Sequence, residues 1–146
     1  MRRMIAVVAL VFGLALPAWA DSLSDIRTLA EQGNPEAQFA LGTLYRDGQG
    51  VEQDLTETIK WWEKAAEGGY VDAQFALGNI YSGGYGLKRD YVLSYMWFDI
   101  TATRTETPWL APIAQSNRDA LVTRMTADQV SKAKQMSADW LAEHKN

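Results

Sequence analysis

Apolar residues recur every three or four positions along most of the chain, a spacing typical of short amphipathic helices. In the first such stretch, residues 21–32, Leu23, Ile26 and Leu29 share one face. Gly33 follows, and glycine is a common residue just after a helix. We therefore predict a helix at the start of the folded region.

The next two helices begin at residues that favour helix N-termini. Asn34 is a good N-cap, and Pro35 suits the first helical position. Asp54 is the expected N-cap of a second helix over residues 55–67. Between them, Gly48-Gln49-Gly50 predicts a tight turn, because glycine adopts positive φ without a steric penalty.

This pair of helices occurs twice. Residues 30–65 align with residues 66–101 at an offset of 36, and 14 of the 36 aligned positions are identical. A fixed period of this length is typical of repeat architectures. The second unit predicts helices over 71–82 and 91–103, with Asp90 as an N-cap. We predict an all-α fold, an α/α superhelical solenoid of two repeats with helical caps, and no strand.

Four repeated residues indicate how the units pack. Gly42 and Gly78 lie within predicted helices, where glycine costs about 0.5–1 kcal/mol relative to alanine. Their recurrence at one register indicates close approach of a neighbouring helix. Trp61 and Trp97 are predicted to fill the space between successive helix pairs, with roughly 150–250 Å² buried by each ring.

The repeat stops after residue 104. A helix is expected over 109–125, with Pro112 in its first turn, and a capping box from Thr126 to Gln129 opens a last helix, where Ala133, Ala138 and Trp140 are among the residues available to pack. A terminal unit must cover the apolar face of the last repeat. The predicted division is a signal peptide (1–20), an N-terminal capping helix (21–33), repeat 1 (34–69), repeat 2 (70–104) and C-terminal capping helices (105–146).

The first twenty residues have the order of a Sec-type signal peptide. Arg2-Arg3 precede an apolar run from Met4 to Leu16, and Ala18-Trp19-Ala20 forms a small-x-small cleavage site. We expect an exported protein, periplasmic or secreted, without stable membrane insertion after cleavage. The alternative is an uncleaved N-terminal anchor, because the apolar segment is near the lower length limit for a span.

The net charge of the chain and its lack of Lys and Arg clusters limit the classes of partner that it is expected to bind. Without Arg2 and Arg3 the chain has 12 basic and 18 acidic residues, a net charge of −6. Nucleic acid and anionic membrane surfaces bind clusters of Lys and Arg, and the sequence shows no such run. There is no cysteine, so no disulfide or thiolate nucleophile is available. We expect a protein partner and no cofactor.

The repeated unit resembles the Sel-1-like repeat family. The resemblance rests on Ala-Glu-x-Gly at residues 30–33 and 66–69, Ala-Gln-x-x-Leu-Gly-x-x-Tyr at 37–45 and 73–81, Gly-x-Gly at 48–50 and 84–86, and an Asp followed seven residues later by Trp. It covers about residues 30–102, and residues 103–146 look like the cap of exported bacterial members. The chain differs from the family pattern at Thr58, Ser94 and Thr101.

What the resemblance implies is an α/α solenoid, akin to tetratricopeptide repeats, that acts in protein–protein scaffolding. Family members are adaptors in signalling and assembly, and exported ones include regulators of envelope signalling. Some cysteine-rich relatives are reported to bind penicillin or to act weakly as β-lactamases. This chain lacks the cysteines that mark them.

Candidate catalytic residues are few. His144, the only histidine, lies close to the C-terminus and is expected to be solvated. The glycine pairs follow helices rather than strands, so they indicate turns and not phosphate-binding loops. Asp47, Glu52, Asp54 and Glu57 lie together in sequence, but Asp54 is expected to cap a helix and the others to be solvated. We predict no catalytic and no metal-binding residue.

A binding face is the stronger prediction. The first helices of stacked pairs line a concave surface, and positions three or four apart share a helix face. The candidate partner-binding residues on this face are Glu36, Thr43, Arg46, Asp47, Asp72, Asn79 and Ser82, with Gln49 and Tyr85 as secondary candidates at loop tips. Several differ between the units, as a ligand face would; any solvated face would differ in the same way.

Two hypotheses follow. The leading one is a non-catalytic interaction module, an adaptor or regulator in the bacterial cell envelope. The alternative is a weak envelope hydrolase or binder that acts on a peptidoglycan- or β-lactam-like ligand, and it rests on the family resemblance alone.

Overall fold

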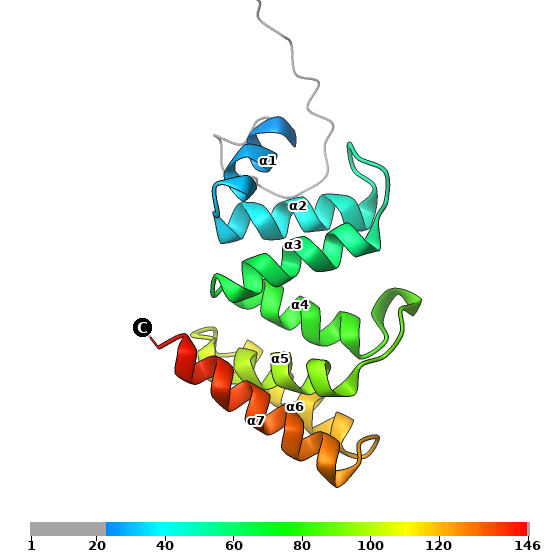
Figure 1. The fold of residues 1–146 in the computed structure, drawn as a ribbon, viewed down its shortest axis with the longest axis vertical. Helices are drawn as coiled ribbons and strands as arrows, with labels where there is room; N and C mark the ends of the chain where they lie inside the picture. Colours follow the sequence, from blue (N-terminus) through cyan, green and yellow to red (C-terminus); the bar gives the residue numbers. More distant parts are fainter. Residues whose placement is uncertain (1–22, 146) are drawn as a thin grey trace, which may run out of the picture.

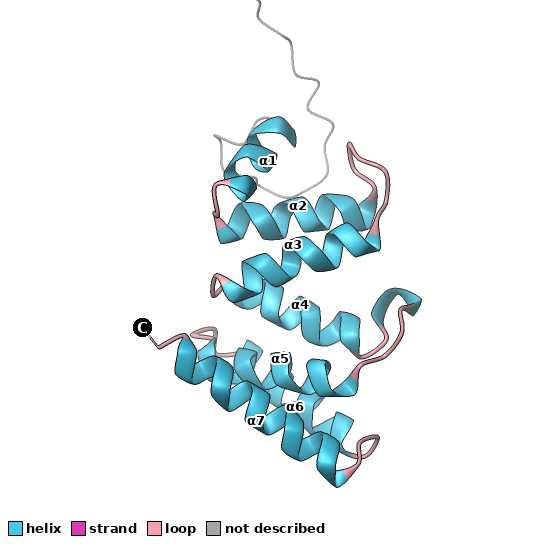
Figure 2. Cartoon of the chain, in the orientation of Figure 1, coloured by secondary structure: helices cyan, strands magenta, loops and turns pink. Residues whose placement is uncertain are grey.

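The structure is a computed structural model, and it describes residues 23–145. Every element of regular structure in this range is helical (Figure 2). The elements are α1 (Leu23–Glu31), α2 (Pro35–Asp47), α3 (Leu55–Glu67), α4 (Val71–Tyr81), the short 3₁₀ helix η1 (Gly84–Gly86), α5 (Tyr91–Arg104), α6 (Leu110–Val122) and α7 (Ala127–Glu143). The predicted signal peptide, residues 1–20, lies outside the described residues.

The helices stack in pairs along one axis (Figure 1). α2 packs against α3 and α4 against α5, while α3 also packs against α4 and so joins the two pairs. α1 covers α2 at one end of the stack. At the other end, α6 and α7 both pack against α5. This arrangement confirms the predicted all-α solenoid of two repeats.

The predicted capping residues begin their helices. The side chain of Asn34 accepts a hydrogen bond from the Ala37 amide at 2.8 Å, and those of Asp54 and Asp90 accept from amides in the first turns of α3 and α5. Thr126 and Gln129 form the reciprocal capping box of α7. Because the first amides of a helix have no partner within it, each cap satisfies a group that would otherwise need water.

Some helix ends differ from the prediction by one to three residues. α4 ends at Tyr81, because the chain turns at Gly83 with φ +105°. α6 covers residues 110–122 rather than 109–125, since the capping box at Thr126 requires extended backbone before α7 begins. Hydrophobic periodicity alone does not locate such ends.

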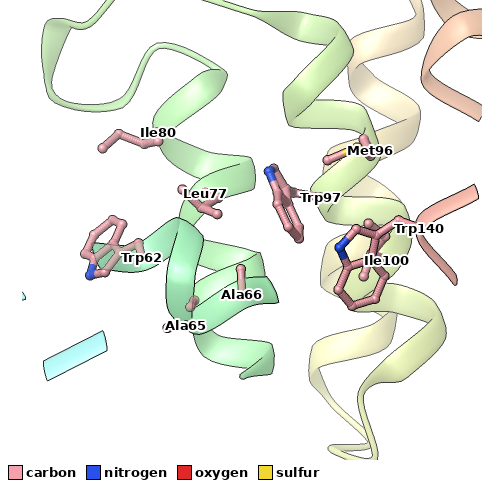
Figure 3. Packing of buried hydrophobic residues seen from close by; sticks show 10 residues of the cluster. Trp62, Ala65, Ala66, Leu77, Ile80, Met96, Trp97, Ile100 and Trp140 are labelled. Carbon is pink, nitrogen blue, oxygen red and sulfur yellow. The ribbon is translucent and has the colours of Figure 1, made fainter. Parts of the chain in front are cut away.

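The largest buried cluster joins both repeats to the last helix (Figure 3). Trp97 is 3% exposed and lies in this cluster with Leu77, and its ring meets the edge of the Trp140 ring with centroids 5.9 Å apart. Trp61 is buried in a separate cluster with α1 and α2. Both tryptophans are interior, as predicted. Ala138, expected to be available for packing, is exposed instead because it lies on the outer face of α7.

The mid-helix glycines lie under aromatic rings. A Cβ added at Gly42 would lie 2.5 Å from the ring of Trp62, and one at Gly78 would lie 2.6 Å from the ring of Phe98. The close approach predicted from these glycines is therefore present within each helix pair. The rings that cause it belong to residues 62 and 98, one position after the tryptophans that the repeat aligns.

A buried glutamine links each unit to the helix before it. Gln38 Nε2 donates to the carbonyl of Ala30 at 3.1 Å, and Gln74 Nε2 donates to that of Ala66 at the same distance. The carbonyls belong to residues near the C-terminal ends of α1 and α3, where a helix leaves acceptors without internal partners. The repeated Ala-Gln pair therefore satisfies one of these acceptors at each junction.

The three departures from the family pattern are accommodated. Thr58, Ser94 and Thr101 are fully buried. Their hydroxyls donate to backbone carbonyls at 2.7–3.0 Å, those of Thr58 and Thr101 within their own helices and that of Ser94 to Gly78 on α4. Because buried hydroxyls with partners cost little, these residues fit tightly packed second helices.

Across residues 23–145, none of the helices has the length and apolar content needed to span a bilayer.

Candidate interaction surface

An open hollow of about 320 Å³ lies where α2 and α4 meet the start of α6. Its lining combines aromatic rings with a few polar side chains: Phe39, Arg46, Trp62, Asp72, Phe75, Ala76, Asn79, Tyr85, Trp109 and Leu110. Helical spacing explains this convergence. Asp72, Phe75 and Asn79 are three and then four positions apart and so share one face of α4.

Aromatic rings pack together around the hollow. Phe39 stacks on Trp62 with centroids 5.5 Å apart and lies 5.3 Å from the ring of Tyr70. Phe75, the counterpart of Phe39 in the second unit, meets the edge of Phe98 at 5.6 Å. The indole of Trp62 donates to the carbonyl of Phe39 at 3.2 Å. These contacts hold the rings in fixed positions, so a ligand would not have to order them.

Arg46 of α2 lies close to a ring of its own repeat and to a ring of the connection between α4 and α5. Its guanidinium lies 5.6 Å from the Trp62 ring centroid and 5.9 Å from that of Tyr85. Its Nε also donates to Asp47 Oδ1 at 2.6 Å. This hydrogen bond lowers the pKa of the Asp47 carboxyl, so the pair is charged at neutral pH. Arg46 thus places a cation between two rings at the edge of the hollow.

Tyr85 adopts a backbone conformation that is rare for a side-chain-bearing residue. It has φ +56° within η1, between Gly84 and Gly86, and is 56% exposed. A tyrosine at positive φ costs free energy and persists only where surrounding contacts stabilise it. Here the conformation places an exposed ring beside Arg46 at the edge of the hollow.

Exposed apolar side chains continue from the hollow onto α6. Trp109 is 65% exposed, and Ile113, one helical turn further along, is 44% exposed. An exposed tryptophan beside a hollow with an aromatic lining is characteristic of interaction sites, because tryptophan contributes large apolar area and a hydrogen-bond donor.

The structure brings some of the sequence-predicted residues together. Arg46, Asp72, Asn79 and Tyr85 line the hollow, and Asp47 lies at its edge through its pair with Arg46. The remaining candidates, Glu36, Thr43, Ser82 and Gln49, do not line it. The hydroxyls of Thr43 and Ser82 donate to backbone carbonyls of their own turns.

Sequence reasoning missed the aromatic lining. The predicted partner-binding residues are polar or lie at loop tips, so they do not include the apolar and aromatic residues Phe39, Trp62, Phe75 and Trp109. Phe39 and Phe75 are identical in the two units. For these two residues the available signal is an aromatic side chain at the same position of the first helix in both units, whereas Trp109 lies outside the repeat and has no such signal.

Three of the four carboxylates considered for catalysis have structural roles, while Glu52 is exposed. Asp54 caps α3, as predicted. Asp47 pairs with Arg46, and Glu57 lies 3.1 Å from Lys60 Nζ, so these two are paired rather than merely solvated. Among residues 23–145, no group of three or more histidine, cysteine and acidic residues is arranged to hold a metal ion.

His144 is not freely solvated, contrary to expectation. Its ring stacks on Trp140 with centroids 3.9 Å apart, and its Nε2 lies 3.3 Å from Glu67 Oε2. Trp140 Nε1 donates to the same carboxylate at 3.0 Å. These contacts join the end of α7 to the end of α3, because α7 runs back across the stack. His144 is therefore part of the packing of the last helix.

Stacked helix pairs linked by glycine-containing turns define this protein as an α/α solenoid. A sequence model of the Sel1 repeat matches residues 35–70 and 71–104. A comparison with curated proteins gave no match.

Two solved structures are similar over most of the chain. One is the crystal structure of a protective antigen present in uropathogenic Escherichia coli strains, which displays an SLR fold; it is 33% identical over 85% of this chain, with a TM-score of 0.74. The other is a Sel1 repeat protein from Oxalobacter formigenes, 30% identical over 81% of this chain, with a TM-score of 0.52. The chain spans 26% of the first structure and 98% of the second.

The chain therefore belongs to the Sel1 repeat family. Sel1 repeats are in general protein–protein interaction modules, and members of the family are typically non-catalytic binding or scaffold proteins.

Proposed function

We propose that this protein is a non-catalytic adaptor or regulator of the bacterial cell envelope that binds a protein partner in the aromatic hollow between α2, α4 and α6. The observation that carries the proposal is the exposure of Trp109 and Tyr85 beside packed rings. Exposed apolar patches mark interaction sites, because a partner that covers large aromatic side chains removes their apolar area from water.

The form of the hollow supports a peptide segment as the bound part of the partner. The rings offer apolar contacts, while Asp72 and Asn79 on α4 offer hydrogen-bond acceptors and an amide donor at its lining. A pocket with an apolar lining and a few polar groups orients a ligand through the polar groups and binds it mainly through the apolar ones.

The proposed location rests on the sequence of residues 1–20, with its basic start, apolar run and Ala18-Trp19-Ala20 site. Cell fractionation and N-terminal sequencing of the purified protein test it. Export predicts a protein in the periplasm or medium that begins at Asp21. A cytoplasmic protein that keeps its first residues would contradict it.

Site-specific photo-crosslinking tests the proposed surface. A photoreactive phenylalanine analogue at Ile113, beside Trp109 on α6, should capture a partner in living cells on illumination, and mass spectrometry then identifies it. The same analogue at Val122 is the control, because Val122 is comparably exposed on α6 but lies at the opposite end of that helix.

The expected result is a discrete crosslinked product from position 113 that is absent or much weaker from position 122. Equal products from both positions, or none from position 113, would count against the hollow as the binding surface.

A further inference from the structure

A second hollow lies between the start of α5 and the first turns of α7. Its volume is about 440 Å³, and it is lined by Arg89, Asp90, Tyr91, Val92, Leu93, Gln129, Lys132 and Met136. Arg89 belongs to the loop before α5, while Gln129 and Lys132 belong to α7. The folding of the C-terminal helices onto α5 therefore creates this hollow, and the repeat alone does not contain it.

The hollow is cationic in an otherwise acidic chain. Arg89 and Lys132 line it, and Arg124, from the turn between α6 and α7, lies beside the phenol of Tyr91. The proximity of Arg124, followed by that of Arg89, lowers the pKa of this phenol despite some desolvation. Arg89 and Lys132 thus reach one hollow from separate segments, and Arg124 lies close to Tyr91 in its lining.

These cations lack carboxylate partners among the described residues. Elsewhere Arg46, Lys60 and Arg118 each pair with an aspartate or glutamate. No ion pair forms at Arg89, Arg124 or Lys132 within residues 23–145. The one carboxylate in the lining, Asp90, accepts a hydrogen bond from the Leu93 amide as the cap of α5. The lining therefore holds two cations, Arg89 and Lys132, and one carboxylate, which serves as a helix cap.

We propose that this hollow, which we call the cationic hollow, binds the phosphate group of a small organic phosphate or of a lipid headgroup. Guanidinium and ammonium groups that approach from different directions suit the tetrahedral oxygens of phosphate, because each cation can donate to a different oxygen. A planar carboxylate has fewer acceptor directions and a single negative charge. Tyr91 adds a hydroxyl group to the same lining.

NMR of the isotope-labelled protein, purified in the form in which the cell produces it, tests the proposal. The probes are inorganic phosphate and glycerol 3-phosphate at low ionic strength. We expect saturable shifts confined to amides of residues 89–93 and 124–136. Absence of saturation at millimolar probe, or shifts spread over the whole surface, would overturn the proposal.

Charge-neutral variants locate the site. Lys132→Gln and Arg124→Gln should each weaken glycerol 3-phosphate binding about tenfold, the loss of one charge-assisted hydrogen bond. Lys134→Gln is the matched control, since it removes the same charge from α7 outside the lining, and affinity should stay within about twofold. Equal weakening by Lys132→Gln and Lys134→Gln would show non-specific attraction and overturn the proposal.

Two further arms identify the source of the phosphate. Cosedimentation with phosphatidylglycerol vesicles, but not with phosphatidylcholine vesicles, and its loss in Lys132→Gln would assign a lipid headgroup; binding of glycerol 3-phosphate alone would assign a free organic phosphate. Tighter binding of a hexaglutamate peptide than of either phosphate would overturn the assignment to phosphate.

Trp109→Ala should leave phosphate binding unchanged, because the aromatic hollow lies elsewhere, so this proposal and the partner proposal fail independently. Lys132 is exposed, so Lys132→Gln carries the test if Arg124→Gln does not fold.

Discussion

At the scale of single residues, the pairing of glycine with an aromatic ring is the most demanding contact of each repeat. Gly42 lies under Trp62 and Gly78 under Phe98, too close for a Cβ. The free energy that glycine loses in a helix, about 0.5–1 kcal/mol, is offset by the burial of a whole ring against the backbone. This explains why glycine occurs at the same register in both units.

Gly78→Ala tests this contact. Alanine is the better helix former, yet the added Cβ would meet the Phe98 ring, so we expect the free energy of unfolding to fall by about 1–3 kcal/mol. Urea denaturation measures it. In a Phe98→Ala background the ring is absent, and there the same substitution should be neutral or stabilising by up to about 1 kcal/mol. A stabilising effect in the wild-type background would contradict the packing.

Among individual residues, the sequence predicted those whose roles are local. Asn34, Asp54 and Asp90 are N-caps because capping depends on neighbours within three positions. Partners distant in the chain could not be predicted in the same way. The bond from Trp140 to Glu67 joins residues 73 positions apart, and no short-range pattern reports such a contact.

At the scale of helices, the second helix of each pair has two adjacent aromatic residues, at 61–62 and 97–98, and the two residues make different contacts. The ring at position 62 or 98 covers a glycine of the same pair, whereas Trp97 packs in the cluster that reaches α7. Trp97 thus links a repeat to the C-terminal helices.

Trp97→Ala should lower the free energy of unfolding by about 3–5 kcal/mol, because it leaves a cavity among buried side chains. The matched control is Trp109→Ala, which removes the same ring from a position 65% exposed and should change stability by less than about 0.5 kcal/mol. Chemical denaturation of both variants measures the difference. Similar midpoints for the two would be incompatible with an interior Trp97.

The contact between α3 and α4 through Tyr81 predicts a dependence on pH. Tyr81 donates to Glu63 Oε1 at 2.6 Å, and burial together with this carboxylate raises the pKa of its phenol well above the usual value. Above pH about 10 the phenol ionises in the unfolded chain but not in the folded one. The stability contributed by Tyr81 is therefore complete below that pH and falls as pH rises further.

The free energy of unfolding of the wild type minus that of Tyr81→Phe, followed from pH 8 to 11, measures this contribution. It should decline above pH 10. Tyr91→Phe is the control and should show no decline, because neighbouring cations lower the pKa of that phenol. A difference that is flat or rising with pH for Tyr81 would contradict the contact with Glu63.

At the scale of the whole molecule, both ends of the solenoid are covered by helices outside the repeat. α1 packs on α2 as α3 packs on α4, and the carbonyl of Ala30 receives the same glutamine bond as that of Ala66. At the other end, α6 and α7 share α5 as their main support. Asp99 on α5 joins them, since it accepts from Arg118 at 2.7 Å and from Ser137 at 2.6 Å.

The sequence predicted the fold more fully than the surface. The 36-residue period and the glycine turns specify the stacking of pairs, because each unit must bury its apolar face on a neighbour. The hollow is different, since it depends on where α6 begins relative to α2 and α4. Trp109 lies outside the repeat, so no alignment of the two units indicates that it joins Phe39 and Arg46.

The most direct test of the central claim is the affinity of the partner captured from position 113 for purified wild type, Trp109→Ala and Val122→Ala, measured by calorimetry. Trp109→Ala should weaken binding by at least about 30-fold, as expected for a residue whose truncation costs 2 kcal/mol or more, while Val122→Ala should bind as tightly as the wild type. Equal affinities for all three proteins, with stability unchanged, would contradict a partner site in the aromatic hollow.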